Sequence, residues 1–403
     1  MTFNLKSVGV VLSAVLTLAA ANASSRDVDD PNQVQKIASS KVRALMALHR
    51  IPGMAVGVIA KGKSMVFNYG LAVVQIKQPV TNDTLFEIGS VSKTFTATLV
   101  AQAQVNGVLS LSDTVGQHLP LLQGSPFGKL SLLSLGTHTP GGLPLQVPEQ
   151  VRNMDELMWY LKGWQPTAAA GSIRSYGNLG IGILGLIVAK TAGQDFSELI
   201  QQQLLAPLEM KHSFIHVPAA LLPNYAMGQT RAGAPIRMAS GVLASEAYGM
   251  RTTAGDLLRF VQANMGLLPL EDKLQRAINA THTGYYQVAG KLADTVSDNA
   301  SVKANPMTQD LIWEQYDYPV TLEALLHGNS AEMIFEAVPV TQITLPQQTQ
   351  RDVWINKTGS TNGFAAYVAF IPSKRMGIVI LTNKNFPIGD RVRLAYEILT
   401  ALQ

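Results

Sequence analysis

The sequence contains no cysteine among its 403 residues. This absence excludes a disulfide framework, a thiolate nucleophile and any zinc or iron–sulfur site built on cysteine ligands. The formal net charge of +4 is small for the length, and lysine and arginine form no long basic run, which argues against nucleic-acid binding. No H-E-x-x-H motif occurs, so the seven histidines are interpreted as ordinary side chains and no metal site is predicted.

Long apolar runs are also scarce. The run 10–21 is nearly unbroken, but it is too short to span a bilayer comfortably. Lys6 precedes it, and Ala21-Asn22-Ala23 fits the small-x-small cleavage pattern. We therefore interpret residues 1–23 as a removed secretory signal peptide, which predicts a periplasmic protein that leaves the membrane after cleavage. The later apolar run 179–189 carries three glycines, as expected of a buried helix.

The first part of the remaining chain alternates between helical and strand patterns. Apolar residues recur at helical spacing over 33–49, and Pro52-Gly53 ends that pattern. The runs 54–59 and 65–74 are typical of strands, and Lys61-Gly62-Lys63 forms a turn between them, so we predict an antiparallel hairpin. A long helix is predicted over 92–106, closed by Gly107.

The middle of the chain has helical periodicity with Pro/Gly turns, whereas the end returns to strands and a helix. We expect middle helices at 130–137, 154–164, 179–191 and 196–205, one helix at 252–265, three strands at 353–356, 365–371 and 377–382, and a last helix at 391–402. This order predicts an α/β fold whose antiparallel sheet combines both chain termini and is flanked by helices. The predicted α/β domain comprises residues 24–107 and 232–403. Residues 108–231 are predicted to form an inserted, mostly helical domain. We expect the active site at the interface of the two domains.

Three short motifs carry the chemistry, and the first is Ser90-Val91-Ser92-Lys93 at the start of a predicted helix. A hydroxyl there lies beside free backbone N–H groups and the positive end of the helix dipole, which stabilise an oxyanion. Lys93 lies one turn later on the same face and, when neutral, can accept the Ser90 proton. The alternative is that Ser90 is a plain helix cap and Lys93 a solvated lysine.

The second motif is Tyr176-Gly177-Asn178. A phenolate next to ammonium groups can act as a general base despite its ordinary pKa near 10. Asn178 offers an acceptor and two donors, which suit a substrate amide. The alternative is that Tyr176 packs in the core and Asn178 caps a helix.

The third motif is Lys357-Thr358-Gly359 at the end of a predicted strand. Lys357 and the Thr358 hydroxyl can bind a carboxylate, while Gly359 lets a substrate lie along the strand edge and Ser360 donates a second N–H to an oxyanion. The alternative is an edge-strand lysine that prevents aggregation. Three motifs in this order indicate a serine acyl-transfer enzyme that acts on a cyclic amide.

With these residues the chain resembles class C serine β-lactamases, and the resemblance covers nearly the whole mature sequence. The segments that carry it are Phe86–Thr96, Gly141–Gln146, Glu246–Gly249, Lys357–Gly363, Phe370–Pro372 and Asn383–Pro387 with Arg391. The family implies acylation of Ser90 by a β-lactam, typically a cephalosporin, with proton transfer by Lys93 and Tyr176. Water then hydrolyses the acyl-enzyme, with Tyr176 in the base role.

The resemblance also implies further site residues. The oxyanion lies between the backbone N–H groups of Ser90 and Ser360, Gln146 contacts the substrate, and Tyr248 forms an aromatic wall. Asn385 and Arg391 belong to a stretch that helps to bind the substrate carboxylate. A monomer without metal or organic cofactor is expected, with a small β-lactam as its only partner. Which of Lys93 and Tyr176 is the base stays open, because they titrate as a coupled pair.

Several features depart from the family pattern. Asn356 replaces a frequent histidine, and the usual Gly-Leu-Gly-Trp-Glu is Asp310-Leu311-Ile312-Trp313-Glu314. A polar insert near 291–306 is predicted to be a solvent-exposed loop. Ser297-Asp298-Asn299 resembles a class A motif but comes too late in the chain, so we interpret it as loop composition. A D,D-peptidase or esterase of the same fold is the alternative function, and a non-catalytic penicillin sensor is a more distant one.

Overall fold

The computed structural model describes residues 30–289, 306–348 and 350–403. Within them, eleven strands form one sheet in the spatial order β3, β2, β1, β16, β15, β14, β12, β11, β10, β13 and β5. In that order their bounds are Gln78–Pro79, Lys63–Val73, Gly53–Ala60, Met376–Thr382, Ala365–Ile371, Val353–Ser360, Glu314–Asp317, Met307–Gln309, Gly284–Val288, Ala337–Gln347 and Ile173–Ser175.

The centre of this sheet joins the two ends of the chain. β1 pairs with β2 on one side and with β16 on the other, both antiparallel, and Met54 lies opposite Thr382. The predicted hairpin and the predicted sheet built from both termini are therefore confirmed. β1, β15 and β16 are buried at every position, because helices cover both faces of the sheet.

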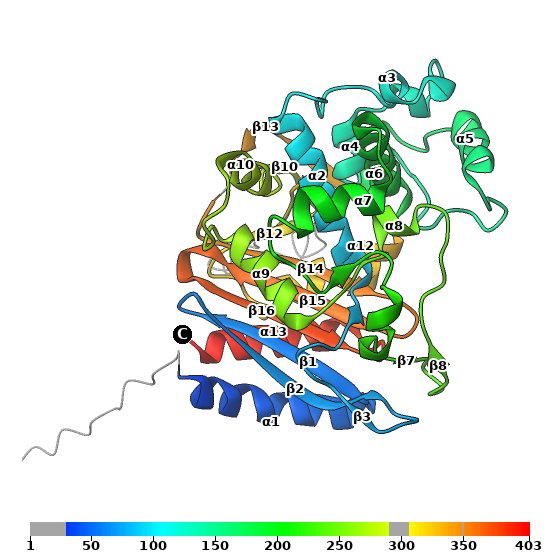
Figure 1. Ribbon diagram of the computed structural model, residues 1–403. Coiled ribbons are helices and arrows are strands. Elements are labelled where there is room, and N and C mark those ends of the chain that lie inside the picture. Colours follow the sequence, from blue (N-terminus) through cyan, green and yellow to red (C-terminus); the bar gives the residue numbers. More distant parts are fainter. Residues whose placement is uncertain (1–29, 290–305, 349) are drawn as a thin grey trace, which may run out of the picture.

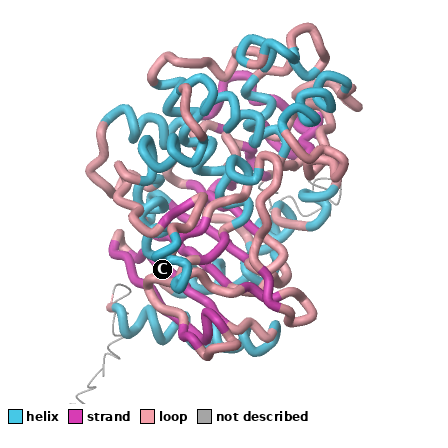
Figure 2. The backbone as a smooth tube through the Cα atoms, turned by 45° about the vertical axis from the view of Figure 1, so that its right-hand side comes forward, coloured by secondary structure: helices cyan, strands magenta, loops and turns pink. Residues whose placement is uncertain are grey.

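One face of the sheet is covered by the terminal helices α1 (Pro31–His49) and α13 (Ile388–Ala401), together with α11 (Leu322–Gly328). The opposite face carries α9 (Ala254–Asn264), α10 (Asp272–Ala280) and α2 (Ser92–Val105), and Figure 2 shows strands between these helical layers. The predicted helices at 33–49, 92–106 and 252–265 are thus confirmed within three residues at each end, and the last helix begins three residues before its predicted start.

The helical region beyond α2 contains short elements around the buried α6. Its helices are α3 (Val115–His118), α4 (Leu132–Gly136), α5 (Met154–Gly163), α6 (Leu179–Ala192), α7 (Phe196–Ile200) and α8 (Ala244–Ala247), with a π-helical turn at Gln201–Leu205 and 3₁₀ turns at Pro120–Leu122, Phe127–Lys129 and Ala219–Asn224. Elsewhere in the chain lie α12 (Ala331–Phe335) and the 3₁₀ turns at Gly89–Val91 and Pro372–Lys374. Two small sheets complete the fold, β4 (Phe86–Glu87) with β9 (Arg251–Thr252) and β6 (Ser213–Phe214), and β7 (Gly228–Gln229) with β8 (Pro235–Ile236).

Two strands differ from the prediction. β14 continues past Asn356 to Ser360, because Lys357 to Ser360 pair with Val368 to Ala365 of β15 despite their polar side chains. β5, from the predicted helical domain, pairs with β13 at the edge of the large sheet, opposite Ala337 to Pro339. The division into two domains stays a prediction, with β5 as the place where the helical region joins the sheet.

Some predictions fall outside the described residues. These are the signal peptide at 1–23, nearly all of the polar loop near 291–306, and Ser297-Asp298-Asn299. Among the described residues, no single helix is both long and apolar enough to cross a bilayer, although α6 and the helical turns 196–205, bent by 82° where they meet, pass on length and composition together.

Candidate active site

Ser90 lies in the 3₁₀ turn Gly89–Val91 that leads directly into α2, as the sequence predicted. Gly89 has a φ of +50°, and a Cβ atom there would come within 2.5 Å of the Ser360 backbone nitrogen. A Cβ atom at Gly359 would likewise lie 1.9 Å from the carbonyl oxygen of Ile88. The two glycines therefore let the end of β14 approach the nucleophile turn, so that the Ser90 and Ser360 segments lie side by side.

Lys93 is fully buried one helical turn after Ser90. Its ammonium group donates to Ser90 Oγ at 2.9 Å, to Asn178 Oδ1 at 2.6 Å and to the Ala247 carbonyl oxygen at 3.1 Å. Burial and the nearby Lys357 lower the pKa of Lys93 to about 8, although Tyr176 opposes that shift. The alternative of a solvated surface lysine is wrong.

Tyr176 follows β5 and lies between cationic side chains. Its ring centroid is 5.0 Å from Lys357 Nζ, 5.4 Å from Lys93 Nζ and 5.5 Å from the Arg174 guanidinium carbon. Burial alone would raise the pKa of the phenol, but Lys357, Lys93 and a hydrogen bond with Ser90 lower it to about 8. The phenol therefore loses its proton far more readily than an ordinary tyrosine.

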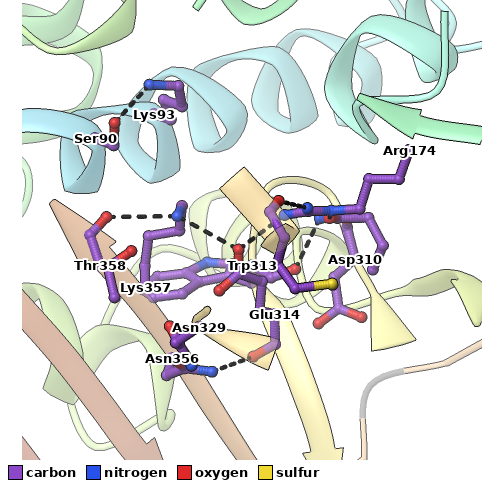
Figure 3. A network of polar contacts seen from close by, with 12 residues as sticks. Ser90, Lys93, Arg174, Asp310, Trp313, Glu314, Asn329, Asn356, Lys357 and Thr358 are labelled. Atoms are coloured by element: carbon purple, nitrogen blue, oxygen red, sulfur yellow. Dashed lines mark hydrogen bonds and ion pairs between the residues drawn. The ribbon is translucent and has the colours of Figure 1, made fainter. Parts of the chain in front are cut away.

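Lys357 reaches this cluster from the buried face of β14 and is 1% exposed. Its ammonium group lies 3.5 Å from Glu314 Oε1, and the same oxygen lies 3.1 Å from Arg174 Nη2 (Figure 3). Glu314 thus bridges two cations that both face Tyr176. Lys357 is a buried charge on an inner strand, which rules out the alternative of a solvated edge lysine.

Asn178 begins α6, but its side chain caps no backbone group of that helix. Its carbonyl oxygen accepts the bond from Lys93, and its amide nitrogen donates to Gln146 Oε1 at 2.6 Å. The helix-cap alternative is therefore wrong. Gln146, Asn178 and Lys93 form one connected polar chain that ends at Ser90.

The remaining predicted residues surround this core. Tyr248 is half-buried immediately after α8, whose Ala247 carbonyl receives a Lys93 bond. Thr358 lies beside Lys357 on β14, and its carbonyl oxygen is 3.4 Å from Lys357 Nζ.

Arg391 has a position that its sequence motif did not indicate. It is 1% exposed, and its guanidinium donates to the Gly359 carbonyl oxygen at 2.7 Å, Ser360 Oγ at 3.0 Å and Asn385 Oδ1 at 3.0 Å. It also donates to the Phe386 carbonyl oxygen, and burial lowers its pKa to about 9. Arg391 therefore supports the end of β14 from inside the protein, and a direct contact with substrate stays a prediction.

Sequence reasoning missed Arg174 and gave Glu314 no role, although both touch the site. Arg174 is 1% exposed and also donates to Gln309 Oε1 at 2.7 Å and to the Met333 carbonyl oxygen at 2.7 Å. Its only sequence signal is its place two residues before Tyr176, the spacing that puts side chains on one side of an extended chain. Among the described residues, no group of three or more His, Asp or Glu side chains is arranged to hold a metal ion.

The residues that depart from the family pattern lie in the β11–β12 turn and beside β12. Asn356 is fully buried, donates to the Glu314 carbonyl oxygen at 3.0 Å and accepts from Asn329 and Tyr367. Residues Asp310 to Trp313 form the turn of the β11–β12 hairpin, and all four are buried. Ile312 has a φ of +73°, a conformation that suits the glycine usual at this position.

Comparisons with known proteins agree with this geometry. The Beta-lactamase family model matches residues 38–403. A β-lactamase of Pseudomonas fluorescens is 47% identical, and the match covers 92% of this chain and 99% of the relative. A β-lactamase of Escherichia coli (strain K12) is 40% identical, and the match covers 93% of this chain and 95% of the relative.

Solved structures give the same result. A class C β-lactamase solved in complex with cefoxitin is 47% identical, with a TM-score of 0.86 over 92% of this chain and 99% of its own. A D-alanine carboxypeptidase of Burkholderia cenocepacia is 49% identical, with a TM-score of 0.85 over 92% and 100%. The Ser90–Lys93–Tyr176–Lys357 cluster thus lies within a sequence and fold whose family is established: the chain belongs to the β-lactamase family.

Proposed function

We propose that this protein, a class C serine β-lactamase, opens the amide bond of β-lactams through an acyl-enzyme on Ser90. The observation that carries the proposal is the convergence of Lys93, Tyr176 and Lys357 on one cluster beside the Ser90 hydroxyl. These groups come from three distant parts of the chain. They supply a nucleophile, a proton acceptor and cationic charge in one place, where the two lysines are buried and Ser90 and Tyr176 are partly exposed.

Tyr176 is the proposed proton acceptor in acylation. In its ammonium form Lys93 donates to all three of its partners, including Ser90 Oγ, and an ammonium group has no lone pair to take a proton. A Tyr176 phenolate, flanked by Lys93 and Lys357, takes the Ser90 proton as the hydroxyl attacks the lactam carbonyl. The same phenol then donates that proton to the departing lactam nitrogen.

The oxyanion of the tetrahedral intermediate is placed between the backbone N–H groups of Ser90 and Ser360. Support comes from the close packing of Gly89 on Ser360, which brings the two segments together. Donors fixed before the reaction stabilise the developing charge without reorganisation. In the second step Tyr176 deprotonates a water molecule, which hydrolyses the ester on Ser90.

The other predicted residues are assigned to substrate binding. Gln146 and Asn178 face the acylamino side chain of the antibiotic, Lys357 and Thr358 its carboxylate, and Tyr248 provides an aromatic wall. The substrate lies along the β14 edge at Gly359. Asn385 and Arg391 complete the carboxylate side, with Arg391 acting through Ser360 and Asn385, since its guanidinium contacts both.

Cephalosporins are the proposed preferred substrates, and hydrolysis in the periplasm after removal of residues 1–23 would give antibiotic resistance. The protein is proposed to act as a monomer without cofactor. The alternative is a D,D-peptidase or esterase of the same fold, and the similarity to the D-alanine carboxypeptidase of Burkholderia cenocepacia favours the peptidase. The two functions differ in deacylation, because a peptidase stays acylated by penicillins.

The test is cephalosporin turnover by the purified protein, repeated with Ser90→Ala and with EDTA. We expect steady turnover that EDTA leaves intact and Ser90→Ala abolishes. Mass spectrometry of the protein after penicillin treatment adds the second arm. A long-lived adduct on Ser90 without turnover would overturn the lactamase proposal in favour of the peptidase or esterase alternative, and activity lost to EDTA would overturn the serine mechanism.

A further inference from the structure

Glu87 is a buried carboxylate near the nucleophile that the proposed mechanism does not use. It lies in β4, three residues before Ser90, and is 1% exposed. Its Oε1 accepts from the Tyr225 hydroxyl at 2.5 Å and from the Met238 backbone N–H at 2.7 Å, and its Oε2 accepts from the Thr361 hydroxyl at 2.6 Å. Hydrogen bonds to an ionised carboxylate are short and strong, so Glu87 holds all three donors firmly.

The three donors come from segments that are far apart in the sequence. Tyr225 and Met238 flank the β7–β8 hairpin, and Thr361 immediately follows β14. The hairpin itself rests on the turn after β14, since a Cβ atom at Gly363 would lie 2.6 Å from an Ile236 methyl carbon. Glu87 therefore fastens the nucleophile segment to the hairpin and to the end of β14.

The bond to Thr361 bears on the oxyanion site. Ser360, the residue before Thr361, packs its backbone on Gly89, and Arg391 holds Gly359 and Ser360 from the other side. The end of β14 is thus held between a buried cation and a buried anion. Of these two charged side chains, Glu87 is the one that belongs to the segment carrying Ser90, and its bond to Thr361 adds to the direct backbone packing of Gly89 on Ser360.

We propose that Glu87 is a positioning residue, which fixes the Ser360 N–H relative to Ser90 through its bond to the Thr361 hydroxyl. This inference rests on the proposed oxyanion site. Misplacing one oxyanion donor slows acylation, because its hydrogen bond forms fully only in the transition state. The contribution of Glu87 therefore belongs to the chemical step more than to substrate affinity.

Thr361→Val tests the proposal, because valine has the shape of threonine without its hydroxyl. Thr361→Ser restores the hydroxyl and serves as the rescue variant. Tyr225→Phe is the matched control, since it removes a different hydroxyl from the same carboxylate and leaves the Thr361 bond in place. For each protein we would measure the acylation rate of Ser90 by mass spectrometry, kcat and KM with a chromogenic cephalosporin, and the melting temperature.

We expect acylation and kcat to fall about tenfold in Thr361→Val with KM nearly unchanged, and to recover in Thr361→Ser. Tyr225→Phe is expected to lower the melting temperature as much as Thr361→Val does but to leave acylation within about twofold of wild type. Equal acylation in Thr361→Val and wild type would overturn the inference. So would equally slow acylation in the valine and serine variants, because packing alone would then be responsible.

A crystal structure of Thr361→Val provides a readout that needs no reaction. We expect the Ser360 nitrogen to move away from Ser90 Oγ, and an unmoved nitrogen would contradict the role of Glu87. If wild type is acylated but does not turn over substrate, the lactamase proposal is refuted. The comparison of acylation rates between wild type and Thr361→Val would still test the role of Glu87.

Discussion

Two buried carboxyl groups lie at the ends of one hairpin turn, and their surroundings differ completely. Glu314 opens β12 and lies within 3.1 Å of Arg174 and 3.5 Å of Lys357. Asp310 follows β11 and is fully buried, yet neither of its carboxylate oxygens has a hydrogen-bond partner among the described residues. Figure 3 shows the Asp310 carboxyl pointing away from the Arg174 guanidinium.

The difference shows what makes a buried acid tolerable. Two cations offset the desolvation of Glu314, and the resulting charge network reaches Tyr176. Burial, with Glu314 as a neighbouring acid, raises the pKa of Asp310 well above its ordinary value of 3.8, so the carboxyl holds its proton more tightly in the folded protein than in the unfolded chain. Two cations therefore compensate the buried carboxyl of Glu314, whereas the carboxyl of Asp310, at a position where the family usually has glycine, has no such partner among the described residues.

The largest expected effect comes from Glu314→Gln. This substitution removes the charge that distinguishes Glu314 from Asp310. Because Arg174 and Lys357 would lose their anion, the free energy of unfolding should fall by about 3 kcal/mol. Glu314 raises the pKa of Tyr176, so its loss should move the acidic limb of the kcat/KM profile to lower pH. Urea denaturation and pH–rate profiles measure both. Glu323→Gln, at an exposed position, is the control. If Glu314→Gln has the stability and the pH–rate profile of wild type, the Glu314 contacts with Arg174 and Lys357 contribute to neither.

The next effect comes from Asp310→Asn, which removes the ionisable group at the same shape. A carboxyl whose folded pKa is raised holds its proton more tightly when folded, so its stability contribution is present below pH 3.8 and is lost as pH rises toward the folded pKa. At pH 8 the variant should be more stable than wild type by about 1–3 kcal/mol, and near pH 3 the two should agree. Thermal denaturation across this range, with the exposed Asp83→Asn as control, measures the difference. A gain in the stability of Asp310→Asn that does not depend on pH would contradict the raised pKa of Asp310.

The smallest effect concerns the backbone of the same turn. Ile312 is buried with a φ of +73°, so Ile312→Ala and Ile312→Gly both lose side-chain packing, but only glycine relieves the backbone. The glycine variant should therefore be more stable than the alanine variant by about 1 kcal/mol, the reverse of their usual order. Urea denaturation of the pair decides this. An alanine variant of equal or greater stability would mean that the turn relaxes after truncation.

The reacting groups were predictable from the sequence because they occur in motifs. Ser90, Lys93, Tyr176 and Lys357 each belong to a short pattern, and the structure brings them together. Hydrophobic patterning likewise located β1 and β15 closely, since buried strands between helical layers are continuous apolar runs.

The supporting residues were not predictable in the same way. The sequence gives no chemical role to Arg174, Glu314 or Glu87, because their roles depend on partners that lie 43 to 274 positions away. Their contacts arise only when strands from different regions pair. The end of β14 was missed because its polar residues look like a loop, whereas pairing with β15 is what makes them a strand.

The pairing of β1 with β16 has a consequence for biogenesis. Gly53 and Asn383, which share a hydrogen bond at that junction, lie 330 positions apart, so the middle of the sheet cannot close until almost the whole polypeptide has been synthesised. Such non-local closure is slow, and it keeps the growing chain incomplete for most of translation. The catalytic cluster, which combines Ser90 with Lys357, is therefore assembled only when nearly the whole polypeptide is available.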